Sequence, residues 1–562
     1  MGRAGVGRDR GDVVADGVVV GAGPNGLVAA CRLADAGWDV VLLEAADHVG
    51  GAVASAELTP GWTADLASAF YPLAAQSPAL RRLDLASHGL RWEHAPAVLA
   101  HLPSSWSEHC AVLHRRPEDT AAALDERAPG DGDVWLDLLR QWRQMREPLL
   151  RALLGPFPPV PAAVRLLRRM GSAPDALRLA RTLLLPLSQM GEELFRGQDP
   201  RLLLAGNAMH ADIPSVAPGS GGFGWLLCML GQDVGYPVPA GGAGALSGAI
   251  ARRARAAGAD IRLRSPVTRI VVGGGRALGV VTADGTRIRA RRAVLADVAV
   301  PQLYRRLLDP GEVPRRIMAD LDRFTWDLPT VKVNWALSGP IPWRARDARL
   351  AGTVHLGADD RELAMWSAAL SSGQESPHTF MLLGQMAVAD PSRAPAGGDS
   401  VWAYSHLRRG RPEPGEGAAL AARMEVEVEA HAPGFRDLVV DRMVQGPDEL
   451  QAMDANLVDG AVNGGTAQLH QQLIFRPTPA SLGRPETPVL GLYVAGAGAH
   501  PGGGVHGGPG DIAARAALRS ARLGDLPGRA LTRLIRHLGS EPEGTRTSAE
   551  PSGRRPESAR TA

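Results

Sequence analysis

Three glycines near the N-terminus are spaced as in a loop that binds a dinucleotide. The sequence Gly-Ala-Gly-Pro-Asn-Gly at residues 21–26 directly follows an apolar run at residues 18–20. In such a loop the first glycine permits a tight turn, the second leaves room for a pyrophosphate, and the third lets the next helix pack closely on the strand. The first amides of that helix, expected over residues 24–36, point at the phosphates. The residues predicted to contact the cofactor here are Gly21, Gly23, Pro24, Asn25 and Gly26.

A carboxylate and a second glycine pair follow at positions that fit the same cofactor. Glu44 ends a second apolar strand, 18 residues after Gly26, where its side chain can accept a hydrogen bond from a ribose hydroxyl. Gly50 and Gly51 come next. A GxGxxG pattern alone is weak evidence, but here both strands, the helix and the acid occur in register, which predicts a complete dinucleotide-binding unit.

A second glycine-rich segment lies near the other end of the chain. Residues 491–496 form an apolar strand that runs into a glycine-rich stretch, and a helix is expected over residues 511–522. Because glycine has no side chain, such a backbone can approach a flat or charged ligand closely. A flexible linker is the alternative, but the flanking strand and helix argue against it. The predicted cofactor contacts are Gly496, Gly498, Gly504 and Val505.

Lys332 is the single lysine among 61 basic residues. Arginine is always charged, whereas a buried lysine can shift its pKa and take part in catalysis. Lys332 is therefore a candidate for a site where arginine would not serve. The alternative is a surface lysine retained by chance.

The composition argues against several classes of function. The 562 residues carry a formal net charge of +2, so no overall field favours nucleic acid. The three cysteines lie far apart and show no metal-binding spacing, so we expect no metal site. An apolar leader and a run of about 18 apolar residues are both absent from the sequence. We therefore expect a cytoplasmic protein, either free or held peripherally at a membrane.

The elements that must position these residues alternate strands with helices. Apolar residues at helical spacing dominate residues 131–230, and residues 260–296 have the pattern of successive strands. Further strands are expected at 331–336 and 400–405. The helical region 160–196 carries arginines beside leucine-rich faces. It could rest on a membrane surface or pack as an amphipathic helix pair on its own domain.

Together these motifs resemble the flavin amine oxidase superfamily. Within it the chain is most similar to the phytoene desaturase and carotenoid isomerase-like oxidoreductases, in the branch of the pyridine nucleotide-disulphide oxidoreductase domain-containing 2 group. The similarity covers about residues 14–523. Its specific matches are Asp65-Leu-Ala-Ser-Ala-Phe, Pro239-Ala-Gly-Gly-Ala-Gly-Ala-Leu, Asp390-Pro-Ser-Arg-Ala-Pro, Ala432-Pro-Gly-Phe and His500-Pro-Gly-Gly-Gly-Val.

The resemblance implies an α/β fold of two domains, α+β in overall arrangement. A Rossmann-like FAD-binding domain is assembled from discontinuous segments, and a substrate domain with a mixed sheet and helices is inserted between them. The FAD-binding domain would comprise residues 14–72, 236–300 and 486–523, and the substrate domain residues 73–235 and 301–485. Residues 1–13 and 539–562 are expected to be disordered.

The resemblance also implies the cofactor and roles for individual residues. FAD rather than NAD would be the bound nucleotide, with the backbone at Val267 stacked against adenine. Lys332 would orient a water molecule or assist proton transfer at flavin N5. His500 and His506 would lie near the flavin ring, as hydrogen-bonding groups, as acid or base, or merely as loop residues. His210, Tyr404 and His406 are candidates for the wall of the substrate cavity.

The function that follows is oxidation by an FAD-dependent enzyme. A hydrophobic substrate of polyene or isoprenoid type would be dehydrogenated by hydride transfer to flavin N5, or isomerised, and an unidentified external acceptor would reoxidise the flavin. One alternative is amine oxidation, which needs an aromatic cage. Another is a flavoprotein whose main role is regulatory, through contacts with other proteins.

Overall fold

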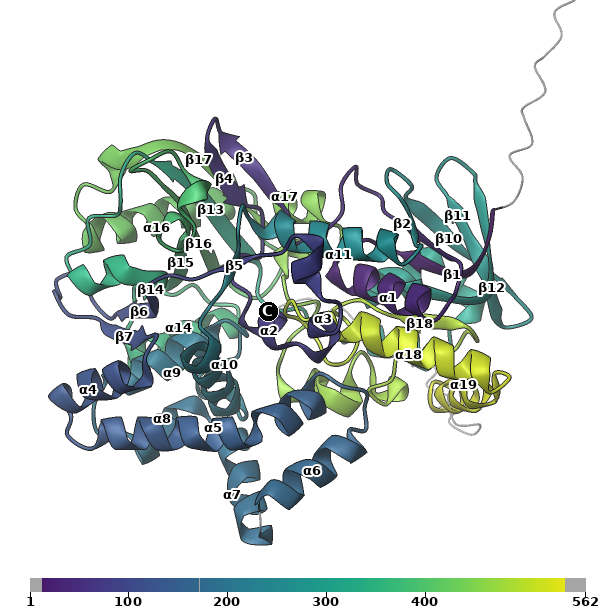
Figure 1. Cartoon of the computed structure of the whole chain (residues 1–562), viewed down its shortest axis with the longest axis horizontal. Coiled ribbons are helices and arrows are strands. Elements are labelled where there is room, and N and C mark those ends of the chain that lie inside the picture. The colour runs from purple at the N-terminus through teal and green to yellow at the C-terminus, as the bar shows by residue number, and fades with distance from the viewer. Residues whose placement is uncertain (1–12, 171, 541–562) are drawn as a thin grey trace, which may run out of the picture.

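The computed structural model describes residues 13–170 and 172–540, and it shows an α/β fold of two domains with two seven-stranded sheets (Figure 1). The first sheet has the order β10-β11-β12-β1-β2-β9, and β18 pairs with β12. Its strands are β1 (Val13–Val20), β2 (Val40–Leu43), β9 (Asp260–Arg262), β10 (Val267–Gly273), β11 (Arg276–Thr282), β12 (Arg287–Ala296) and β18 (Leu492–Val494). Three segments far apart in the sequence thus build one sheet, within the ranges predicted for the FAD-binding domain except at Val13.

Helices cover both faces of this sheet, because its parallel strands are apolar on both sides. The first face carries α1 (Pro24–Asp35), α11 (Ala243–Ala256) and α18 (Gly508–Arg522). The second carries α13 (Arg315–Asp322) and α19 (Leu526–Leu538), and α19 is a helix that sequence reasoning did not assign. A Cβ atom on Gly510 would overlap the carbonyl oxygen of Asn25, so glycine lets α18 lie directly against α1.

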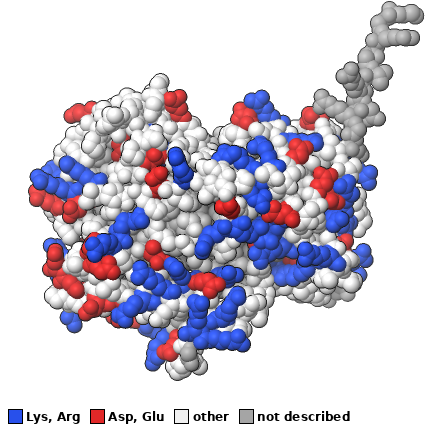
Figure 2. Space-filling view, in the orientation of Figure 1, with Lys and Arg blue, Asp and Glu red and all other residues white. Residues whose placement is uncertain are grey.

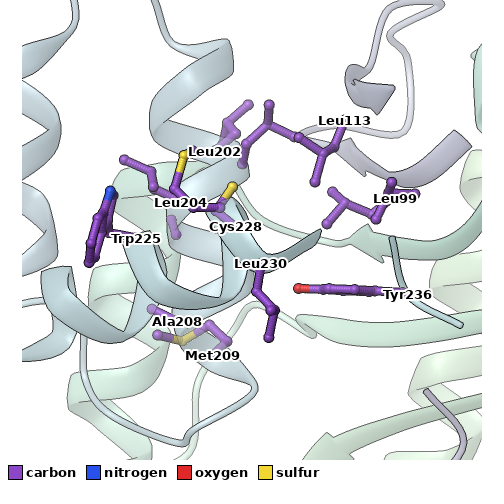
Figure 3. Packing of buried hydrophobic residues seen from close by; sticks show 14 of the residues in the cluster. Leu99, Leu113, Leu202, Leu204, Ala208, Met209, Trp225, Cys228, Leu230 and Tyr236 are labelled. Atoms are coloured by element: carbon purple, nitrogen blue, oxygen red, sulfur yellow. The ribbon is translucent and has the colours of Figure 1, made fainter. Parts of the chain in front are cut away.

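The second sheet has the order β17-β13-β16-β15-β14-β6-β7. Its strands are β6 (Ala97–Leu102), β7 (Ala111–His114), β13 (Thr330–Leu337), β14 (Ala351–Leu356), β15 (Met381–Gln385), β16 (Asp399–His406) and β17 (Val439–Gln445). One face packs against α16 (Glu416–His431). The other packs against α5 (Asp131–Leu153), α9 (Asp199–Met209) and α10 (Ser220–Val234). Figure 3 shows Leu204 and Ala208 beside Trp225 and Cys228 in this core.

The structure differs from the predicted limits of the domains and of the disordered ends at three places. Val13 begins β1, so the strand starts one residue inside the segment predicted to be disordered. Residues 79–90 were assigned to the substrate domain, yet their apolar side chains pack in the core of the first sheet. Of the predicted disordered tail, Gly539 and Ser540 close α19; residues 1–12 and 541–562 lie outside the described part of the chain.

Charges of both signs are mixed on the surface, and the cysteines are buried. Acidic and basic side chains are mixed over most of the face seen in Figure 2. Cys31, Cys110 and Cys228 are buried free thiols. Within the described ranges, no three histidine, cysteine or acidic side chains meet in a way that could hold a metal ion. Among the same residues, no helix combines the length and apolarity that crossing a membrane requires.

Candidate functional site

A cavity of about 390 Å³ brings together the two glycine-rich segments and the second sheet. Its first half is a floor of small residues, and its second half is a wall of apolar and aromatic side chains. The predicted cofactor residues that line it are Gly23, Pro24, Asn25, Gly496, Gly498, Gly504 and Val505. Two segments that the sequence separates by more than four hundred residues therefore form one cradle.

The first glycine turn has the geometry expected of a phosphate-binding loop. Gly21 adopts a φ of 95°, in the left-handed region that glycine tolerates best. A Cβ atom on Gly26 would overlap the Gly21 carbonyl oxygen, so the turn requires glycine there too. Gly21 and Gly26 thus shape the turn without lining the cavity. The amides at the start of α1 favour an anion, and the buried Oδ1 atom of Asn25 beside them is a hydrogen-bond acceptor without a partner, which fits a hydroxyl group of the cofactor.

Four other predicted cofactor residues do not line this cavity. Glu44 accepts hydrogen bonds from the amides of Ala22 at 2.6 Å and Ala46 at 2.9 Å, so its carboxylate organises the end of β2. Gly50 and Gly51 both adopt positive φ, at 122° and 52°. Val267 begins β10 and is half-buried. Their contacts with the ribose and the adenine stay predictions.

Asp297 is a residue that sequence reasoning missed. It directly follows β12, and its Oδ2 atom accepts a hydrogen bond from the Gly26 amide at 2.8 Å. Cβ atoms on Gly23 and Gly496 would each approach this carboxyl group within 3.0 Å, so it lies between the two glycine segments. The pKa of Asp297 is raised to about 8, mainly by burial and also by the nearby Asp454 carboxylate, against the hydrogen bond from the Gly26 amide. The one signal in the sequence was its position at the end of an apolar strand.

Lys332 projects from β13 into the second half of the cavity. Only 2% of the residue is exposed, its Nζ atom donates a hydrogen bond to the Asp65 carbonyl oxygen, and it lies 5.6 Å from the centre of the Trp402 ring. Burial lowers the pKa of Lys332 to about 7, although the Asp65 carboxylate raises it. The structure therefore excludes a surface lysine. Contact of Lys332 with flavin N5 stays a prediction.

A buried ion pair supports the backbone that Lys332 contacts. The Asp65 carboxylate lies 2.8 Å from the guanidinium of Arg393, and neither side chain is exposed. Asp65 also accepts hydrogen bonds from Ser55 and from the Ala243 amide. Asp65 and Arg393 both occur in motifs that carry the family resemblance, but nothing in the sequence shows that they meet.

Aromatic rings form much of the second half of the cavity. The Trp402 and Tyr404 rings stack with their centres 6.0 Å apart and their planes at 16°. A Cβ atom on Gly384 would overlap the Trp402 ring, so glycine on the neighbouring strand lets this ring lie across the sheet. Phe223 of α10 adds to the wall, as does His210.

The remaining predicted histidines lie outside the cavity wall. His406 instead forms a buried ion pair with Asp212 at 2.7 Å, and the Asp212 carboxylate raises its pKa against the effect of burial. The Nε2 atom of His500 lies 3.0 Å from the Gly155 carbonyl oxygen, and its ring packs on Phe157. Burial lowers the pKa of His500 to about 4. This position gives no support for a role of His500 as acid or base at the flavin. His506 is also buried and lies 3.2 Å from the Gly503 carbonyl oxygen.

Several known proteins resemble this chain in sequence or in fold. Mouse pyridine nucleotide-disulfide oxidoreductase domain-containing protein 2 is 28% identical over 556 residues, covering 90% of this chain and 94% of its own length. The zeta-carotene-forming phytoene desaturase of Myxococcus xanthus is 26% identical over 514 residues, covering 87% and 90%. The structure of putrescine oxidase bound to putrescine superposes with a TM-score of 0.56 at 17% identity, covering 91% of this chain and 100% of that one.

The predicted resemblance is confirmed by a family model. The model of the flavin containing amine oxidoreductases matches residues 25–522, which include the last two residues of the first glycine turn, Lys332 and the C-terminal glycine stretch. FAD is therefore the cofactor of this cradle. The chain belongs to the flavin containing amine oxidoreductase family and is an FAD-dependent oxidoreductase.

Proposed function

We propose that this protein dehydrogenates, or isomerises, a hydrophobic substrate of polyene or isoprenoid type. The observation that carries the proposal is the wall of the second half of the cavity, where Phe70, Leu226 and Leu227 join the stacked Trp402 and Tyr404 rings. Such a wall binds apolar surface and excludes water from the reacting atoms. The relationship to a phytoene desaturase supports the same substrate class.

The charges around the cavity favour a neutral substrate over an amine. Among the described residues that line it, the carboxyl groups are those of Asp297 and Asp454, and Asp297 lies at the glycine turn. An alkylammonium ion in the second half would meet Lys332 instead of a carboxylate. Amine oxidation is the second candidate function, favoured by the fold shared with putrescine oxidase.

For this reaction the protein binds the substrate, excludes water from it and provides one titratable group. When bound, FAD accepts a hydride from a substrate C–H bond. The apolar wall holds that bond in place. Burial lowers the pKa of Lys332 to about 7, so a neutral amine is populated near neutral pH, and this amine can hold a water molecule or accept a proton.

An anaerobic substrate screen tests the proposal. The FAD-loaded protein is mixed with polyene and isoprenoid hydrocarbons in detergent and, separately, with putrescine and other primary amines, while the visible flavin bands are recorded. We expect bleaching by a member of the first group. Bleaching by amines alone would establish amine oxidation. A protein that binds FAD, is bleached by neither group and leaves the recovered polyenes without isomerisation would favour the regulatory role.

We further propose an external electron acceptor, a cytoplasmic location and no binding of nucleic acid. The formal net charge of +2 supports the last point. Flavin reoxidation by oxygen, compared with reoxidation by quinones, identifies the class of acceptor.

A further inference from the structure

Two consecutive helices, α6 (Val160–Met170) and α7 (Ala173–Leu184), each carry a broad apolar side with two parts, a first face that packs on the core and a second face that is exposed. The first face of each helix packs on the core through partly buried side chains, which are Leu166, Met170, Leu179 and Leu183. This set accounts for the attachment of the helices to the domain. The amphipathic pair expected from the sequence is therefore present, but packing uses only part of its apolar surface.

The second apolar face of each helix points into solvent. On α6 it comprises Val160, Val164 and Leu167, of which Leu167 is 57% exposed. These residues are four and three positions apart and so share one side of the helix. On α7, Leu177 is 73% exposed and Leu184, seven positions later, is 54% exposed. Scattered single leucines need no explanation, but a repeated face on adjacent helices does.

Arginine side chains border this exposed apolar face. Residues 160–185 contain five arginines and one acidic residue, Asp175. Arg169 and Arg181 pair with glutamates of neighbouring helices, and Arg178 pairs with Asp175. Arg165 and Arg168 form no ion pair with any residue that the structure describes. Figure 2 shows arginines gathered at the lower end of the molecule, around the place that α6 and α7 occupy in Figure 1.

The segment that ends α7 packs against α10, a helix that lines the cavity. The amide of Gly221 in α10 donates a hydrogen bond to the Leu185 carbonyl oxygen at 3.0 Å. A Cβ atom on Gly222 would overlap the backbone of Leu183. The next residues of α10, beginning with Phe223, line the cavity. The end of α7 therefore lies against the start of a helix that forms part of the cavity wall.

We propose that α6 and α7 form a docking face for a lipid bilayer with anionic headgroups. The exposed valines and leucines enter the boundary between headgroups and acyl chains, and the arginines contact the lipid phosphates. Charge decides between occupants: a second copy of this chain would bring the same two arginines without ion pairs, Arg165 and Arg168, to this surface, whereas anionic lipid neutralises them. The inference does not depend on which substrate the cavity takes.

Sedimentation with vesicles tests this docking face on the full-length, FAD-loaded protein. Vesicles of phosphatidylcholine mixed with phosphatidylglycerol should bind the protein, and vesicles of phosphatidylcholine alone should bind it much less. Removing the charges in Arg165→Ala/Arg168→Ala should weaken binding about 30-fold, from roughly 1 kcal/mol for each arginine at the surface. High salt should have a similar effect.

A second variant, Leu167→Glu/Leu177→Glu, should lose binding at least about tenfold, because each glutamate must leave the boundary region. The matched control is Leu526→Glu, which changes a leucine of α19 that is 71% exposed and should bind as the wild type does. All variants should keep the wild-type melting temperature, since the changed side chains are exposed. Three results would overturn the proposal: no sedimentation of the wild type, equal binding to both kinds of vesicle, or a dimer that the leucine variant alone abolishes.

Discussion

Replacing Asp297 with asparagine should remove a pH dependence from FAD binding. In the structure the Asp297 carboxyl group accepts a hydrogen bond from the Gly26 amide, at the helix end where the pyrophosphate of FAD binds. A carboxylate there repels the phosphates, whereas a protonated carboxyl group does not. FAD should therefore bind to the protein with Asp297 protonated.

The size of the change in the Kd of FAD follows from the pKa of Asp297, which is about 8. Below about pH 7 the group is already protonated, and the Kd of FAD should be constant. Above the pKa each bound FAD must take up one proton, so the Kd should rise about tenfold per pH unit, which is about 1.4 kcal/mol. At about pH 9 the wild type should thus bind roughly tenfold more weakly than at neutral pH.

The variant Asp297→Asn should bind FAD with a constant Kd over the same range. Its amide oxygen can still accept the hydrogen bond from Gly26, while the side chain no longer titrates. The other ionisable groups close to Asp297 are Glu44, after β2, and Asp454, at the end of α17 (Pro447–Met453). The matched control is Asp454→Asn, which should keep the tenfold rise but begin it at lower pH, because Asp454 raises the pKa of Asp297.

Fluorescence titration of the apoprotein with FAD measures these constants without any turnover. Calorimetry in two buffers of different ionisation enthalpy counts the protons and should find one taken up per FAD at about pH 9. A wild-type Kd that stays flat to this pH would refute the reasoning. So would an Asp297→Asn variant that keeps the tenfold rise.

Three further variants examine the rest of the site. Lys332→Met should keep FAD but slow flavin reduction by about 10²–10⁴-fold; the wild-type rate should rise as pH rises through about 7, and this limb should vanish in the variant. Arg393→Met leaves the Asp65 carboxylate buried and unpaired, so urea titration should show a loss of about 3–5 kcal/mol, and a change below about 1 kcal/mol would contradict the ion pair's role. Gly26→Ala should purify without FAD, since its Cβ overlaps the Gly21 carbonyl oxygen; a normal flavin spectrum would disprove this.

The parts of the site that the sequence predicted are those whose geometry is local. Gly21, Gly23 and Gly26 lie within six residues, and their spacing alone specifies a turn and the start of α1. The strand and helix around the C-terminal glycines could be predicted for the same reason. Each pattern specifies its own backbone, and the family resemblance then indicated that the two patterns meet.

Contacts between distant residues could not be predicted in this way. Asp297 and Gly26 are 271 positions apart. No pattern in the sequence predicts that this carboxyl group contacts the glycine turn. For His500, the sequence predicted a place near the flavin that the structure does not support. Its place in the glycine stretch suggested the flavin, but the backbone there directs the ring to Gly155 and Phe157. Side-chain direction depends on tertiary packing, which spacing does not encode.

The pairing of β18 with β12 determines when during synthesis the protein can acquire its cofactor. Ribosomes release the chain from its N-terminus, so the first glycine turn and β12 emerge long before residues 492–494. Until then β12 presents part of its edge unpaired, a template for misassociation that a nascent chain must keep covered. FAD can be held by both glycine segments only after the residues that follow β18 have left the ribosome. A chain that stops short of β18 should therefore fail to bind FAD and should expose the unpaired edge of β12.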